Sequence, residues 1–149
     1  MNAMLSLTPQ RRFCLSLAAL FVVAFGLYLH ALSPAFHPDD SPETITAGAT
    51  LSIQHPPGYP LHSLLGRLAT LLGPGPATFD INALSAFFGA LALVLAALLL
   101  LRLGREFAPW ASASRALEGL ALAGALVIGA TQQLAFQATI AKGGIYTLN

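Results

Sequence analysis

Apolar residues gather in three long runs that are separated by polar segments. The runs cover residues 13–32, 81–101 and 117–136, and each holds about 20 mostly apolar positions. At roughly 1.5 Å of rise per residue, a helix of that length crosses the hydrocarbon core of a bilayer. The pattern therefore predicts an all-α integral membrane protein with three transmembrane helices and a long polar loop over residues 33–80.

Two short helices are predicted within this loop. Ser41 followed by Pro42 is typical of a helix start, because serine caps free backbone N–H groups and proline suits the first helical turn. This start predicts a helix over residues 42–52. Leucines at helical spacing predict a second helix over residues 61–72. The second helix is too short to span a bilayer, so we expect an amphipathic helix lying in the membrane interface.

Composition supports the membrane assignment. Hydrophobic residues make up 56% of the 149 positions and charged residues only 9%, whereas soluble domains carry about 25% charged residues. A soluble domain of this length could not bury so much apolar surface. The net charge of +1 without a basic run argues against a nucleic acid partner. The single cysteine, Cys14, lies in an apolar run and is interpreted as a small apolar side chain.

The arginines indicate the orientation of the three helices. Arg11 and Arg12 precede the first run. Three more lie between the second and third runs: Arg102, Arg105 and Arg115. Because basic residues favour cytoplasmic loops, we expect a cytoplasmic N-terminus and an outer loop at the plasma membrane. A cleaved signal peptide is the alternative for the first run, but signal cores are shorter, about 7–15 residues.

The loop holds most of the polar chemistry, with four of the six acidic residues and three of the four histidines. Asp39, Asp40 and Glu43 stand at the start of the first loop helix. A carboxylate in a partly desolvated site can act as a general base. Helix capping on a solvated loop also explains Asp40 and Glu43. From the spacing alone both interpretations stay open.

A metal site is a further hypothesis for the same loop. His37, Asp39, Asp40 and His55 offer the imidazole and carboxylate groups that bind divalent metals. No spacing motif supports such a site, so we expect no metal. His55 lies in a rigid proline-rich turn that would position an imidazole to bind phosphate or to transfer a proton.

The loop motifs resemble those of one membrane family. The motifs are DSPE at residues 40–43, HPPGYPL at 55–61 and NALSA at 82–86, with YTLN at 146–149 fitting the next one. They are similar to the protein O-mannosyltransferase-like family of the GT-C superfamily of glycosyltransferases. The resemblance covers residues 10–149 and implies a GT-C-like, multi-pass N-terminal portion.

The resemblance implies an inverting transferase that takes its sugar from a polyprenyl-phosphate donor. In such enzymes the first outer loop carries an acidic residue that removes a proton from the acceptor hydroxyl. That place corresponds to Asp40, with Glu43 as a second catalytic carboxylate. Four further residues are expected to bind substrate: Asp39, His55, Tyr59 and Arg67. Of these, His55 and Arg67 are expected to bind the donor phosphate. Membrane lipid and a lipid-linked sugar are the expected partners, together with an acceptor protein or glycan.

Two departures from the family pattern affect this interpretation. The family has an acidic residue just before the tyrosine of its last motif, whereas Gly143, Gly144 and Ile145 precede Tyr146 here. GT-C enzymes also have more than three spans, so the chain is expected to be the N-terminal part of a larger enzyme. The alternative function is a non-catalytic membrane module that binds a lipid or a partner protein through the loop. A transporter subunit is disfavoured, because no charged residue lies in mid-span.

Overall fold

The computed structural model describes five stretches of the chain, residues 8–33, 35–38, 40–56, 58–111 and 114–148. Every regular element within these stretches is a helix, and none of the described residues lies in a strand. The prediction of an all-α protein is therefore confirmed.

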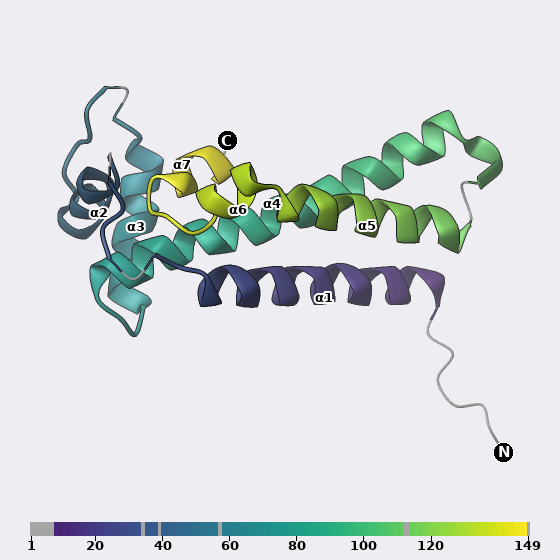
Figure 1. Ribbon diagram of the computed structural model, residues 1–149, viewed down its shortest axis with the longest axis horizontal. Helices are drawn as coiled ribbons and strands as arrows, with labels where there is room; N and C mark the ends of the chain where they lie inside the picture. Colours follow the sequence, from purple (N-terminus) through teal and green to yellow (C-terminus); the bar gives the residue numbers. More distant parts are fainter. Residues whose placement is uncertain (1–7, 34, 39, 57, 112–113, 149) are drawn as a thin grey trace, which may run out of the picture.

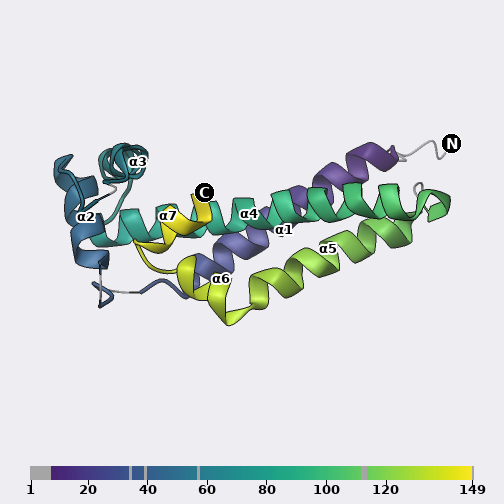
Figure 2. The ribbon, with the colours of Figure 1, turned by 90° about the horizontal axis from the view of Figure 1, so that it is seen from above.

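Three long helices lie side by side along the molecule (Figure 1, Figure 2). They are α1 (Pro9–His30), α4 (Ala77–Phe107) and α5 (Arg115–Ala130). The central helix, α4, packs against both of the others. Both α1 and α4 are long and apolar enough to cross a membrane. Between α4 and α5 the chain turns through the short helix η1 (Pro109–Ala111).

The third apolar run is not one continuous helix. The chain bends at Thr131, which separates α5 from α6 (Gln132–Gln137), as Figure 2 shows. Thr131 has an extended backbone, and its hydroxyl oxygen accepts a hydrogen bond from the backbone N–H of Leu134, so it caps the new helix. With 16 residues, α5 is shorter than the about 20 that a spanning helix needs. The prediction of a single helix over residues 117–136 is therefore not confirmed.

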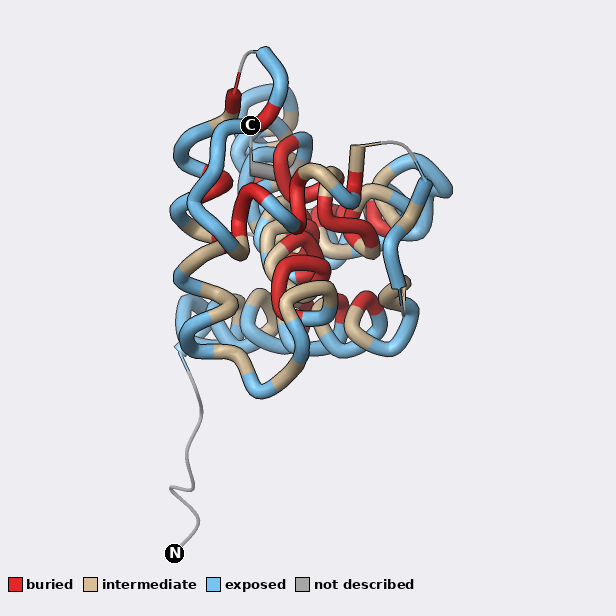
Figure 3. Tube along the Cα trace, turned by 90° about the vertical axis from the view of Figure 1, so that its left-hand side faces the viewer, coloured by how far each residue is buried: buried red, intermediate tan, exposed pale blue. Residues whose placement is uncertain are grey.

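Small residues let the long helices approach one another. The buried core contains Ala24 of α1, Ala90 and Ala97 of α4, and Ala125 of α5. Tyr28 joins α1 to α5, because its hydroxyl donates a 3.0 Å hydrogen bond to the Gly129 carbonyl oxygen. Figure 3 shows the buried positions gathered in the middle of the molecule, where the helices meet.

The outward faces of α1 and α4 are apolar. Large aliphatic side chains on these faces are more than half exposed: Val22, Val23, Leu27, Leu95 and Leu99. Extended apolar surface of this kind is unfavourable in water and marks a contact with lipid or protein. Together with the length of the two helices, it indicates that the chain associates with a membrane.

The polar loop folds into two short helices that pack together at one end of α4 (Figure 1). They are α2 (Ser41–Thr50) and α3 (Pro60–Leu72), near the predicted ranges 42–52 and 61–72. A proline lies in the first turn of each helix, where its missing N–H costs no hydrogen bond. The two helices cross at Gly48 and Gly66, where there is no side chain to hold their backbones apart.

The leucine stripe of α3 faces outward. One member, Leu65, is half-buried, and the other five are at least half exposed: Leu61, Leu64, Leu68, Leu71 and Leu72. The opposite face, with His62, Ser63 and Gly66, is buried. His62 thus lies off the leucine stripe, on the side of the helix that faces the interior of the fold. The exposed stripe is the kind of surface that binds lipid or a partner protein.

Candidate functional site

Four ionisable side chains from three segments meet at the start of α2. Asp40 precedes the helix and Glu43 lies in its first turn. His55 comes from the turn between α2 and α3, and Lys142 from the segment between α6 and α7 (Gly143–Leu148). We call this group the Asp40 cluster.

Glu43 holds His55 by two hydrogen bonds. Its carboxylate oxygens accept from the His55 backbone N–H at 2.6 Å and from the ring Nδ1 at 2.5 Å. The side-chain bond first, and then the backbone bond, lower the pKa of Glu43 below its ordinary value of 4.5. Because a carboxylate only accepts, the Nδ1 of His55 carries the proton. The other ring nitrogen, Nε2, lies 3.9 Å from Oδ2 of Asp40.

Asp40 is paired with Lys142. The lysine ammonium donates to Oδ2 of Asp40, and the lysine and aspartate side chains are 23% and 35% exposed. The Asp40 side chain makes no capping hydrogen bond to α2. Its main-chain carbonyl oxygen instead accepts from the backbone N–H and the hydroxyl of Thr44, both at 2.9 Å. Capping therefore does not explain this carboxylate in the structure.

The segment that carries Lys142 is fixed to α4. The Ser85 hydroxyl donates a buried 3.2 Å hydrogen bond to the Ala141 carbonyl oxygen. Gly144 lies so close to the interior that a Cβ there would be 2.6 Å from Nε2 of His62 and 2.8 Å from Oγ of Ser85. These contacts on both sides of Lys142 fix the position of its backbone. A side chain at position 144 would therefore force His62 or Ser85 to move.

His62 is a buried, uncharged histidine beneath this segment. It is 2% exposed, and neither ring nitrogen has a hydrogen-bond partner among the described residues. Burial lowers the pKa of His62 to about 4, so the ring is neutral at pH 7. His62 is a packing residue of the α3–α7 contact and lies outside the Asp40 cluster.

Two of the predicted substrate-binding residues, Arg67 and Tyr59, are not members of the Asp40 cluster. The Arg67 guanidinium donates a 2.7 Å hydrogen bond to the Ala49 carbonyl oxygen near the end of α2. That carbonyl is about 13 Å along the helix from Asp40, at 1.5 Å per residue. Tyr59 stands at the start of α3 with a left-handed backbone, φ 42°. The fourth predicted residue, Asp39, lies outside the described residues.

The metal hypothesis receives limited support. His37 packs its ring edge against Phe136 at 4.9 Å between centroids and does not join the Asp40 cluster. Asp40, Glu43 and His55 have ligand atoms within 4.8 Å of one another, so these three could hold a cation. Lys142 already supplies a positive charge to Asp40, and His55 already donates to Glu43. The arrangement fits an ion-pair network better than a set of free metal ligands.

Lys142 is the member of the cluster that the sequence analysis missed. The residue lies 102 positions from Asp40, so no local motif joins the two. One signal was available, since Lys142 is the only lysine of the chain. With it, the cluster offers a carboxylate, an imidazole and an ammonium, groups that can accept a proton and bind an anion.

The contact between Glu43 and His55 is expected to weaken in acid. The pKa of Glu43 is lower in the folded chain than its ordinary value of 4.5, so the contact favours the fold above that value. It is lost as the pH falls through the lower, folded pKa. We expect the hydrogen-exchange protection factor of the His55 amide to fall on acidification below pH 4.5.

The same protection should be reduced at neutral pH in a Glu43→Gln variant, and its dependence on acid should disappear. Glu106→Gln, at the far end of α4, is the matched control and should leave His55 unchanged. Equal protection of His55 in the Glu43→Gln variant and the unmodified chain would contradict the assignment.

Comparison with known proteins places the chain among transferase relatives. Residues 40–149 match the family described as the protein O-mannosyl-transferase TMEM260 N-terminal domain. A mouse protein (Mus musculus), the protein O-mannosyl-transferase TMEM260, is 39% identical over 75 residues. That alignment covers 50% of this chain and 11% of the mouse protein. No solved structure matches.

Proposed function

The chain belongs to the family of the protein O-mannosyl-transferase TMEM260 N-terminal domain, and we propose that it is the N-terminal part of a membrane glycosyltransferase. The proposed reaction moves a sugar from a polyprenyl-phosphate donor to an acceptor hydroxyl, with inversion, as in GT-C enzymes. One observation carries the proposal. Within the residues that match the family, the fold brings His55 and Lys142 to the carboxylate of Asp40.

We propose that the chain crosses the membrane three times. The first two crossings are α1 and α4, and the third is α5 continued by α6 beyond its bend at Thr131. The five arginines near one end of these helices favour a cytoplasmic N-terminus. The Asp40 cluster then lies at the outer side of the plasma membrane.

In the proposed reaction, Asp40 accepts the proton of the acceptor hydroxyl. The hydroxyl oxygen bonds to the anomeric carbon, the bond from that carbon to the phosphate oxygen breaks, and polyprenyl phosphate leaves with the electron pair. Lys142 provides positive charge and hydrogen bonds for the departing phosphate. His55 can donate to it from Nε2 when both ring nitrogens carry a proton. Glu43 fixes the ring of His55. None of these steps requires a metal.

An apolar surface near the far end of α2 is proposed to contact the lipid part of the donor. A hollow of about 480 Å³ lies between the end of α2 and the start of α3. Leu51, Ile53, Pro60 and Leu64 are among its lining residues, and the exposed leucine stripe of α3 continues from it. Tyr59 lies between two lining residues in the sequence, Gly58 and Pro60, and is proposed, with Arg67 and Asp39, to contact the substrate beyond its phosphate.

The proposal is tested with the full-length protein in membranes. Labelled mannose would be offered either on polyprenyl phosphate or on a nucleotide, and its transfer to acceptor protein would be measured. We expect transfer from the lipid-linked donor alone. Transfer from the nucleotide donor alone would overturn the proposal. Transfer from neither donor would favour the alternative, a membrane module that binds lipid or a partner through the exposed leucine stripe.

A further inference from the structure

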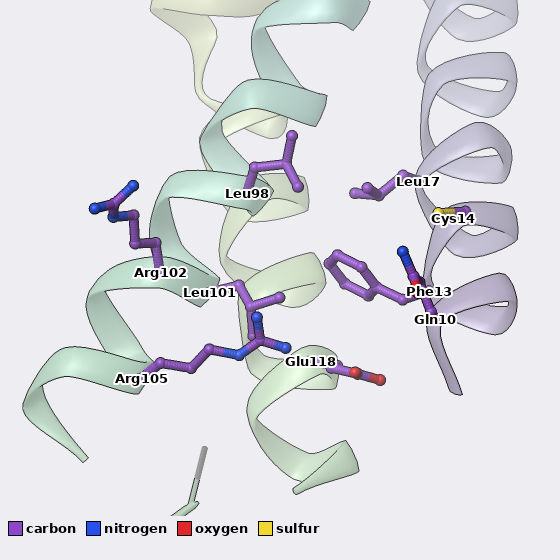
Figure 4. A pocket seen from close by; sticks show the side chains of 9 residues that line it. All are labelled: Gln10, Phe13, Cys14, Leu17, Leu98, Leu101, Arg102, Arg105 and Glu118. Atoms are coloured by element: carbon purple, nitrogen blue, oxygen red, sulfur yellow. The ribbon is translucent and has the colours of Figure 1, made fainter. Parts of the chain in front are cut away.

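A groove of about 700 Å³ lies between α1, α4 and α5, at the end of the long helices away from the Asp40 cluster (Figure 4). Its walls are apolar side chains of α1 and α4: Phe13, Leu17, Leu98 and Leu101. Figure 4 shows Phe13 and Leu17 of α1 facing Leu98 and Leu101 of α4 across the groove. Arg105 extends from α4 toward the groove, whereas the guanidinium of Arg102 points away from α1. The site is thus apolar along its length and cationic at one end.

The charges at this end of the molecule are mainly positive. Side chains over residues 8–30 and 97–130 include five arginines and two glutamates, which leaves a net charge of +3. Arg102 is paired with Glu106 at 3.3 Å. Arg105 has no ion-pair partner among the described residues, although Glu118 also lines the groove. At least one guanidinium is therefore free to bind an anion.

We propose that this groove binds one anionic phospholipid, with its phosphate at Arg105 and an acyl chain between α1 and α4. A phospholipid matches both parts of the site, since apolar walls contact the chain and guanidinium groups bind phosphate. The excess of positive charge favours an anionic headgroup. A zwitterionic headgroup also carries a positive group, which the arginines would repel. The groove is remote from the Asp40 cluster, so the inference does not rest on the proposed function.

Cys14 provides a direct reporter. It is the only cysteine of the chain, it is exposed, and it lines the groove. A lipid in the groove should therefore shield its thiol. The chain would be reconstituted in nanodiscs of phosphatidylcholine, with or without phosphatidylglycerol, and the rate of Cys14 modification by neutral N-ethylmaleimide would be measured by mass spectrometry. We expect the rate to fall several-fold when phosphatidylglycerol is present.

Paired variants separate binding in the groove from a general effect of surface charge. Arg105→Gln should abolish the protection. Arg11→Gln removes the same charge at the same end, but Arg11 does not line the groove, so the protection should remain. Leu17→Trp would fill the space for the acyl chain, and native mass spectrometry should then show loss of bound phosphatidylglycerol with Arg105 present.

Three results would overturn the proposal. Equal rates of Cys14 modification in the two lipid mixtures would show that no anionic lipid shields the thiol. Protection that survives in the Arg105→Gln variant would show that this residue does not hold the headgroup. Phosphatidylglycerol that stays bound to the Leu17→Trp variant would show that the acyl chain does not lie between α1 and α4.

Discussion

Replacing Asp40 with asparagine is expected to reduce sugar transfer by the full-length protein about 100-fold to 10,000-fold, the usual contribution of a general base. Asparagine keeps the shape of the side chain but cannot accept the hydroxyl proton. It also loses the charge that pairs with Lys142. The measurement is the initial rate of transfer from polyprenyl-phosphate mannose in membranes, divided by the amount of protein.

The fold should survive this change. The side chain of Asp40 does not cap α2, and the first turn is held by its main-chain carbonyl oxygen, which asparagine retains. Glu106→Gln removes an acidic residue at the opposite end of the molecule and should transfer sugar at the unmodified rate. An Asp40→Asn protein that transfers sugar at full rate would eliminate Asp40 as the base.

The family resemblance, and not the local spacing, pointed to Asp40, Glu43 and His55, because the spacing alone left capping and catalysis open. Asp40 and Glu43 are one helical turn apart, and the proline-rich turn brings His55 back to them within 12 positions of Glu43. Lys142 reaches the cluster only through the packing of α7 and its preceding segment on α4, which depends on Ser85 and Gly144. Such a contact between distant segments leaves no periodic pattern. For the same reason, the contact of His37 with Phe136 was not expected.

For the helices too, some features follow from the local sequence and others depend on packing between distant segments. Length and apolar composition are enough to identify α1 and α4. Hydropathy does not detect the cap at Thr131, because one threonine hardly changes the average over a span. Leucine spacing predicts the period of α3 but not which face is buried. In this fold the small and polar face packs inward at Gly66, and the leucines are left outside.

Replacing Gly66 with valine is expected to separate α2 from α3. A Cβ at Gly66 would lie 3.1 Å from the Cα of Gly48, which is backbone and cannot rotate away. Valine adds two further methyl groups at this contact, and overpacking of a close interface costs about 1–3 kcal/mol. Thermal unfolding in detergent should therefore show a Tm lower by several degrees.

Gly119→Val is the matched control, because a Cβ at Gly119 of α5 meets nothing within 4 Å. Both changes replace a helical glycine with valine, so they share the same effect on helix propensity and differ in packing. Since α2 carries Glu43 and begins just after Asp40, the Gly66 variant should show both a lower Tm and a lower rate of sugar transfer. The Asp40→Asn variant should show a lower rate of sugar transfer with an unchanged Tm. Equal Tm values for the Gly66 and Gly119 variants would show that the α2–α3 contact does not hold the Asp40 cluster in place.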